Sequence, residues 1–305
     1  MGAAFAESPI SITPRVHPAS LPSERQAVLR SDASLVVIPT WVSTDNGASV
    51  TNLARDNFRV SQDNVDQPIS YFVKDDAPIS IGLLFDSSGS MRPKMDKAAE
   101  AVAEFFKTAN TEDEFFLVEF NDRAKLQVPF TTDSGEIYSR IVATHPAGRT
   151  SLFDAIDLGL NQMKKARHTR KALVIVSDGG DNWSRHTARE IRSRLLESDV
   201  QLYAMGIFDP DLSKKSPIEN RNGPALLDEL AVESGGRHYP VDSLNDLPVI
   251  SATIGTDLRN EYLLGYYPAD SRDGKYHHVK VKLALPENSP PLRANYRKGY
   301  YASSE

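Results

Sequence analysis

The sequence contains no cysteine among its 305 residues, which excludes disulfide bonds, thiolate metal sites and cysteine nucleophiles. It also lacks long hydrophobic runs: the longest apolar stretches, such as residues 172–176, are far shorter than the roughly 20 residues that a membrane helix needs. Positive charge is in deficit, because 41 acidic residues face 35 basic ones and give a formal net charge of −6. This balance argues against nucleic-acid or anionic-membrane binding driven by overall charge.

Several motifs of known enzyme classes are also missing. No Gly-x-x-x-x-Gly-Lys-Ser/Thr loop is present, and no Gly-x-Gly-x-x-Gly follows a predicted strand, so nucleotide binding lacks its phosphate cradle. No Gly-x-Ser-x-Gly elbow surrounds the serines of residues 87–90. His277 and His278 point to opposite faces of a predicted strand, which makes them a poor zinc pair. We therefore expect a protein that is not an enzyme.

The remaining composition is that of an ordinary globular protein, with 40% hydrophobic and 25% charged residues. The length predicts about two domains of roughly 150 residues each.

Residues 1–33 contain proline and serine without periodicity and predict an extended N-terminal segment. They include an Ala4-x-Ala6 pattern like the end of a signal peptide, without the basic and apolar regions of a complete one. Either a signal has been trimmed or the pattern arose by chance.

The middle of the chain alternates apolar strands with amphipathic helices. This alternation predicts an α/β fold with a doubly wound, mostly parallel, Rossmann-like sheet. The expected strands are residues 79–85, 114–120, 171–177, 200–206 and 237–240, with a short edge strand at 124–128. The expected helices are residues 95–106, 151–166, 187–198, 224–234 and 246–260.

Both ends of the chain have β texture. At the N-terminal end we expect strands at residues 35–42, 58–61 and 69–73, the last of which returns after a turn at 62–64. At the C-terminal end we expect strands at residues 262–267, 276–285 and 292–300, with a hairpin turn at Asp273-Gly274. Three strands are marginal as an isolated sheet, so we predict one β-sandwich that both ends form together. The predicted domains are residues 1–33 as an extended segment, residues 34–76 plus 261–301 as the discontinuous β-sandwich, and residues 77–260 as the inserted α/β domain.

Oxygen-bearing side chains follow two of the predicted buried strands. Asp86, Ser88 and Ser90 come at the end of the first, Asp178 follows the third, and Thr150 lies directly before a predicted helix. The carboxyl ends of parallel strands meet at one edge of the sheet, where ligands bind. Hard oxygen donors without histidine or cysteine suit a small hard cation such as Mg²⁺. Two carboxylates roughly neutralise that cation, and neutral hydroxyls leave it electrophilic towards an anionic ligand.

This set of residues resembles the metal-ion-dependent adhesion site of von Willebrand factor A domains. The resemblance covers about residues 77–260 and includes the order of strands and helices. The matching positions are Asp86-x-Ser88-x-Ser90, Thr150 and Asp178.

The flanking segments resemble bacterial von Willebrand factor A-related proteins of the Acidobacteria type. The resemblance is carried by residues 53–73 and by residues 261–268 with Gly299-Tyr300. Members of the family commonly lie outside the cytoplasm, which agrees with the Ala4-x-Ala6 pattern. We therefore expect a periplasmic, secreted or surface location.

The resemblance implies metal-dependent binding of a protein partner. Ser88, Ser90 and Thr150 would bind the metal directly in the ligand-competent state, and Asp86 and Asp178 directly or through water. An Asp or Glu carboxylate of the partner would complete the octahedron. The expected ion is Mg²⁺, with Mn²⁺ or Ca²⁺ as alternatives.

Other interpretations stay open beside this one. Arg149 either contacts an acidic ligand or is an ordinary surface arginine, and Ser87 is a further candidate for ligand binding. A metal-assisted phosphoester hydrolase would use Asp86 and Asp178, with Arg149 or Arg92 near the phosphate. A structural envelope protein would instead be recognised through its β-sandwich.

The last predicted helix, residues 246–260, runs directly into the strand that starts after Glu261. In integrin-type members of the family, changes in metal coordination accompany a shift of this helix. We therefore hypothesise that carboxylate binding alters the angle between the two domains.

Overall fold

The computed structural model describes residues 35–45, 47–74, 77–178, 180–207, 219–241, 243–268, 273–286 and 288–302, with only the backbone of 219–222. The predicted extended segment, residues 1–33, lies outside the described residues. Residues 33–305 form one compact unit, so the predicted division into domains stays a prediction. In the described part of the chain, no helix has the length and apolar composition that crossing a membrane requires.

A six-stranded sheet forms the centre of the α/β part, in the order β10-β9-β8-β5-β6-β7. The strands are β5 (Ile79–Asp86), β6 (Glu114–Phe120), β7 (Ala124–Thr131), β8 (Arg170–Ser177), β9 (Gln201–Ile207) and β10 (Arg237–Val241). Neighbouring strands are parallel except β6 and β7. Every residue of β5 and β9 is buried, as expected for strands that are covered on both faces.

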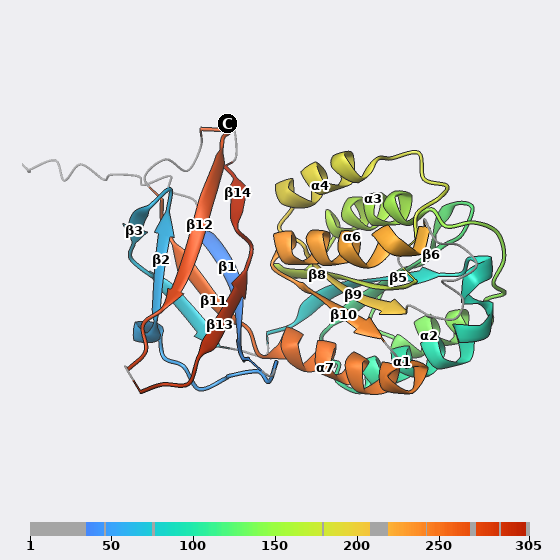
Figure 1. The fold of residues 1–305 in the computed structure, drawn as a ribbon, viewed down its shortest axis with the longest axis horizontal. Coiled ribbons are helices and arrows are strands. Elements are labelled where there is room, and N and C mark those ends of the chain that lie inside the picture. The colour runs from blue at the N-terminus through green and yellow to red at the C-terminus, as the bar shows by residue number, and fades with distance from the viewer. Residues whose placement is uncertain are drawn as a thin grey trace, which may run out of the picture. The chain divides into compact units, whose positions relative to one another are not determined.

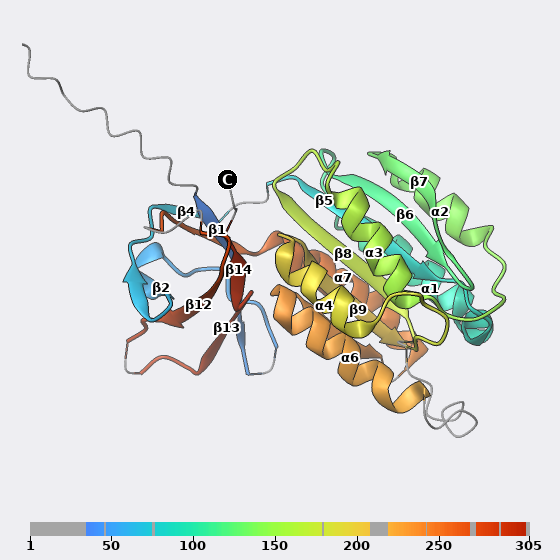
Figure 2. The ribbon, with the colours of Figure 1, turned by 90° about the horizontal axis from the view of Figure 1, so that it is seen from above.

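Among the described residues, three helices cover each face of this sheet (Figure 1). On one face lie α1 (Met95–Phe106), α2 (Ser134–Val142) and α7 (Leu247–Arg259); on the other lie α3 (Leu152–Met163), α4 (Ala188–Glu197) and α6 (Glu219–Ser234), which Figure 2 shows in front of the sheet. Val174 and Ile175 of β8 belong to different hydrophobic clusters, one on each face. The predicted doubly wound, mostly parallel sheet is confirmed.

Two helices differ from the sequence-based expectation. Helix α2 was not expected, because only Ile137 and Ile141 of its nine residues are buried and the apolar stripe is short. Its start is fixed by Asp133, whose side chain accepts a hydrogen bond from the backbone N–H of Gly135 at 2.9 Å. Helix α6 begins at Glu219 rather than at the expected Pro224.

Strands from both ends of the described chain share two further four-stranded sheets, ordered β13-β1-β11-β4 and β14-β12-β2-β3. Their bounds are β1 (Val36–Thr44), β2 (Phe58–Gln62), β3 (Val65–Gln67), β4 (Tyr71–Lys74), β11 (Tyr262–Tyr266), β12 (Tyr276–Leu283), β13 (Leu292–Tyr296) and β14 (Gly299–Tyr301). One hydrophobic cluster joins the two sheets, with Ile38 and Tyr262 from the first and Phe58 and Val281 from the second. The two sheets therefore pack face to face as the predicted β-sandwich.

Several predicted strand pairings are wrong. Asp63 and Asn64 both have positive φ, 49° and 67°, so the chain turns back at once and β3, not residues 69–73, returns beside β2. Strand β4 instead pairs with β11 in the other sheet. The single strand expected over residues 292–300 is two strands, β13 and β14, which lie in different sheets. Strands β11 and β12 also lie in different sheets, so Asp273-Gly274 is no hairpin turn between them.

A buried histidine lies between two carboxylates in the sandwich. The two ring nitrogens of His277, a residue that is 7% exposed, lie 2.7 Å from Asp63 Oδ2 and 2.9 Å from Asp273 Oδ1. Burial opposes protonation of this imidazole, but the hydrogen bonds to Asp63 and Asp273 outweigh it and raise the pKa of His277. The imidazole of His277 therefore ties the β2–β3 turn to the start of β12.

We expect this arrangement to make stability depend on pH. Because the pKa of His277 is higher in the folded state, its contribution is fully present below the ordinary pKa of 6.5 and is lost as the pH rises through the raised value. Urea unfolding between pH 5.5 and 9 should show this loss in the wild type, and His277→Gln should remove it. His278→Gln, at an exposed neighbour on the opposite strand face, should keep it. Equal pH dependence of the His277→Gln variant and the wild type would contradict the assignment.

Candidate metal centre

Asp86 is the last residue of β5 and is completely buried. Its Oδ1 accepts a hydrogen bond from the backbone N–H of Ser88 at 2.8 Å, and its Oδ2 accepts one from Ser177 Oγ at 2.6 Å. Burial and then the negative charge of Asp178 raise the pKa of Asp86 well above its usual range, although the hydrogen bonds from Ser177 and Ser88 oppose this. The ends of β5 and β8 thus place two carboxylates close together.

The loop after β5 adds hydroxyl groups beside Asp86. Ser88 Oγ and Ser90 Oγ lie 3.0 Å apart at the start of the 3-10 helix η2 (Gly89–Lys94), where Ser88 is buried and Ser90 is exposed. Ser87 is different, because its backbone N–H and its hydroxyl both donate to the carbonyl of Phe120, at 2.8 and 3.2 Å. The structure therefore gives the buried Ser87 hydroxyl a structural partner at the end of β6.

The segment before α3 is bound to this loop. The backbone N–H of Gly89 donates to the carbonyl of Gly148 at 3.0 Å. Gly148 has a φ of +80°, and a Cβ there would lie 2.7 Å from Asp122 Oδ2, so both conformation and space favour glycine. Asp122 Oδ1 in turn accepts a hydrogen bond from the backbone N–H of Arg149 at 2.9 Å. Residues 148–150 are thereby fixed next to Ser88 and Ser90.

Thr150 is buried and bound to the loop after β8. Its backbone N–H donates to Asn182 Oδ1 at 2.9 Å, and its carbonyl accepts from the backbone N–H groups of Asn182 and Trp183 at 3.0 and 3.1 Å. Asp181 Oδ1 accepts from the backbone N–H of Phe153 at 3.2 Å, at the start of α3. The side chains of Asp181 and Asn182 therefore fix the segment that leads into α3.

Sequence reasoning missed a buried lysine at this site. Lys94 is 3% exposed, and its Nζ lies 3.4 Å from Asp178 Oδ2 and 3.1 Å from the carbonyl oxygen of Ile207. Its position carried a signal: Lys94 lies four residues before Ala98 and so continues the apolar stripe of α1. A lysine on a stripe that packs against a sheet has to find a buried acceptor or anion, and Asp178 is that anion.

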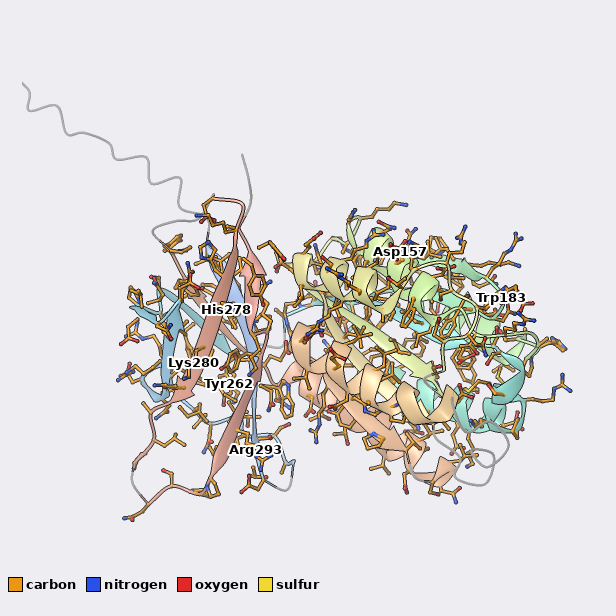
Figure 3. All side chains as sticks on the ribbon, turned by 45° about the horizontal axis from the view of Figure 1, so that its top comes forward. Asp157, Trp183, Tyr262, His278, Lys280 and Arg293 are labelled. Carbon is orange, nitrogen blue, oxygen red and sulfur yellow. The ribbon has the colours of Figure 1, made fainter. Side chains whose placement is uncertain are left out.

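Two arginines lie near the hydroxyl-bearing loops. The guanidinium carbon of Arg149 lies 3.8 Å from the ring centroid of Trp183, and both residues are exposed. Figure 3 shows Trp183 at the surface of the α/β part. Arg92 donates to the carbonyl of Pro146 at 3.3 Å.

The donor set fits a small hard cation. It combines two carboxylates with three hydroxyls, all of them hard oxygen donors. Asp86 accepts hydrogen bonds from the Ser177 hydroxyl and from the backbone and side chain of Ser88, so hydroxyl-bearing residues lie directly beside this carboxylate. Without a cation, two buried carboxylates repel each other across this edge; a divalent ion removes that repulsion.

Comparison with known proteins agrees with this description. Residues 81–180 match the family model of the von Willebrand factor type A domain. The chain carries a von Willebrand factor type A (VWA) fold. No curated protein matches the sequence.

Solved structures give the same fold. A von Willebrand factor type A protein from Catenulispora acidiphila is 11% identical over 90% of this chain and 75% of its own, with a TM-score of 0.51. Proximal thread matrix protein 1 from the mussel byssus, with a zinc-occupied MIDAS motif, is 18% identical over 65% of this chain and 50% of its own, with a TM-score of 0.52. At these identities the likeness shows a shared fold.

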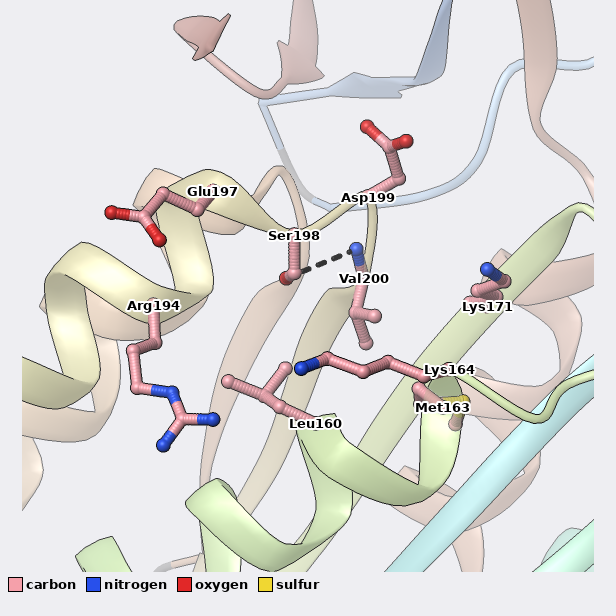
Figure 4. Close-up of a pocket in the computed structure, with 9 residues that line it drawn as sticks. All are labelled: Leu160, Met163, Lys164, Lys171, Arg194, Glu197, Ser198, Asp199 and Val200. Carbon is pink, nitrogen blue, oxygen red and sulfur yellow. Dashed lines mark hydrogen bonds between the residues drawn. The ribbon is translucent and has the colours of Figure 1, made fainter. Parts of the chain in front are cut away.

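A cavity of about 340 Å³ lies at the opposite edge of the VWA sheet, where β8 and β9 begin (Figure 4). It is lined by Leu160, Met163, Lys164, Lys171, Arg194, Glu197, Ser198, Asp199 and Val200. Arg194 is already bound to Asp157 and Asn161 of α3. The cavity therefore adds nothing to the site at Asp86.

The C-terminal end of α7 is held by buried ionic and hydrogen-bonded pairs. They are Asp257 with Tyr239, Arg259 with Asp113, and Glu261 with Arg170 and Gln201. Burial raises the pKa of Glu261, while the nearby charge of Arg170 lowers it in part. A shift of the last helix of the VWA domain along its axis has to break these pairs.

We expect Lys94→Met to destabilise the metal-free VWA domain by about 3 kcal/mol, because Asp178 loses its buried cation. Mg²⁺ should then raise the melting temperature of this variant more than that of the wild type, because the ion replaces the lost charge. Thermal unfolding with and without Mg²⁺ measures both effects. Lys97→Met, at a more exposed lysine of α1, is the matched control and should stay within about 0.5 kcal/mol of the wild type. Unchanged stability of Lys94→Met would contradict the assigned role.

Proposed function

We propose that this protein binds a partner protein through a divalent cation. Asp86, Ser88, Ser90, Thr150 and Asp178 would hold the ion, and an Asp or Glu carboxylate of the partner would complete its coordination. Mg²⁺ is the expected ion, with Mn²⁺ or Ca²⁺ as alternatives. The proposal includes no catalysis.

The proximity of two buried carboxylates is the observation that carries this proposal. Burial and the charge of Asp178 raise the pKa of Asp86, which means that the folded chain holds these groups together at a cost in the absence of a cation. Such an arrangement is typical of a site that is built for a ligand. Lys94 offsets only part of the charge, since it contacts Asp178 alone of the two.

The hydroxyl donors explain why an anionic partner would bind. Two carboxylates neutralise a divalent ion, and the neutral hydroxyls of Ser88, Ser90 and Thr150 add no further negative charge. Ser90 is exposed, so the loop is accessible from solvent on that side. The zinc-occupied motif of the fold-related mussel protein supports a divalent ion at this place in the fold.

A phosphoester hydrolase at the same carboxylates is the weaker interpretation. It needs a cationic group near the phosphate, for which Arg149, which stacks on Trp183, and Arg92, which donates to the carbonyl of Pro146, are the candidates. Turnover of generic phosphomonoesters with Mg²⁺, lost in Asp86→Ala, would establish the hydrolase instead.

We expect Asp86→Asn to abolish the stabilisation of the protein by Mg²⁺, because the amide keeps the shape of the side chain and removes its charge. At pH 8 the metal-free variant should unfold at a denaturant concentration equal to or higher than the wild type, since the repulsion from Asp178 disappears. Titration calorimetry with Mg²⁺ and urea unfolding measure the two effects. Asp133→Asn is the control, because asparagine caps α2 as well as aspartate does. An unchanged Mg²⁺ affinity of Asp86→Asn would refute the proposed site.

Capture of a partner tests the function itself. We expect the immobilised protein to retain a partner from extracytoplasmic fractions of the native organism in Mg²⁺ and to release it in EDTA. The Asp86→Asn variant should retain none. Capture that is unaffected by EDTA would favour recognition through the β-sandwich and a structural envelope role.

A further inference from the structure

An exposed tryptophan and an exposed arginine form a pair beside Thr150. The guanidinium carbon of Arg149 lies 3.8 Å from the ring centroid of Trp183, and the Trp183 residue is 49% exposed. Arginine and tryptophan are the residue types that most often carry binding energy at protein interfaces.

The backbone holds both members of the pair next to the proposed metal ligands. Arg149 directly precedes Thr150, and its backbone N–H donates to Asp122 Oδ1 at 2.9 Å. Trp183 is bound from the other side, through its backbone N–H to the Thr150 carbonyl at 3.1 Å. Asn182 adds two more hydrogen bonds to Thr150. These contacts therefore hold the pair next to Thr150.

Stacking on the indole leaves the edge of the guanidinium available. A guanidinium that lies over an aromatic face still presents its N–H groups sideways, in a geometry that matches a carboxylate. Within the part of the chain that the structure describes, the ion pairs include none between Arg149 and a carboxylate. The nearest acidic residue in its contacts, Asp122, accepts from the backbone N–H of Arg149 rather than from its side chain.

We propose that the Arg149–Trp183 pair selects partners that carry a second carboxylate close to the one bound by the metal. The first carboxylate would coordinate the ion at Asp86 and Asp178, and the second would accept hydrogen bonds from the Arg149 guanidinium. Trp183 acts as a positioning residue that keeps this guanidinium in place. The recognised partner is thus an acidic segment with two nearby Asp or Glu residues. This inference rests on the proposed function.

Synthetic peptides of the form acetyl-Gly-Asp-(Gly)n-Asp-Gly-amide, with n from 0 to 3, test the proposal. Each is compared with the same peptide in which asparagine replaces the second aspartate. Binding to the wild-type protein in saturating Mg²⁺ is followed by NMR chemical-shift titration. For at least one spacing, we expect the two-carboxylate peptide to bind about two- to fivefold more tightly, as for one well-placed charge pair near the surface.

Three variants assign this preference to the pair. Arg149→Gln and Trp183→Leu should reduce the ratio of the two affinities to about one, while the one-carboxylate peptide still binds. Trp183→Phe should restore most of the ratio, because phenylalanine also offers an aromatic face to the guanidinium. Arg189→Gln, at an exposed arginine of α4, is the matched control and should keep the full ratio.

The outcomes separate this inference from the proposed function. Equal affinity of the two peptides at every spacing in the wild type overturns the role of the pair and leaves metal-dependent carboxylate binding intact. A preference that survives Arg149→Gln overturns it as well. Failure of every peptide to bind in Mg²⁺ overturns the proposed function, and with it the inference that rests on it.

Discussion

The structure depends on one electrostatic constraint: two carboxylates lie at the ends of adjacent parallel strands in a buried environment. Strands β5 and β8 are hydrogen-bonded neighbours, so Asp86 and Asp178 come to the same edge of the sheet. Burial, and then the negative charge of Asp178, raise the pKa of Asp86. Lys94 offsets part of the negative charge through its ion pair with Asp178, and a bound divalent cation would neutralise the rest. Favourable packing in the rest of the fold therefore has to offset the cost of burying these two carboxylates.

The doubly wound sheet and its loops provide that packing. All residues of β5 and β9 are buried, and helices cover both faces of the sheet. Hydrogen bonds between Gly89 and Gly148, and between Thr150 and Asn182, fix the loops of the site to one another. The hydroxyl donors are therefore fixed by backbone contacts that do not use the hydroxyls themselves. The Arg149–Trp183 pair benefits from the same contacts.

The sequence was sufficient to predict the central sheet, because continuous apolar runs alternate with amphipathic helices. It was also sufficient to propose the metal ligands, since motif spacing and strand ends indicate them together. It did not indicate Lys94, because a lone lysine on an apolar stripe looks like an exception until its partner is seen. Nor did it indicate the capping by Asp181 and Asn182, which depends on where two distant loops meet. The strand pairings predicted for the sandwich were wrong for a related reason. Tertiary packing decides which short strands pair, and the local feature that set the β2–β3 pairing is the positive φ of Asp63 and Asn64.

The central claim is that the proposed ligands bind one ion at one edge of the sheet. Crystals soaked in Mn²⁺ and measured at an anomalous wavelength test this most directly. The account predicts one strong anomalous peak, coordinated by oxygens of the Ser88, Ser90 and Thr150 side chains and by Asp86 and Asp178 directly or through water. An absence of anomalous density there at saturating Mn²⁺, or a single peak at other residues, would contradict it.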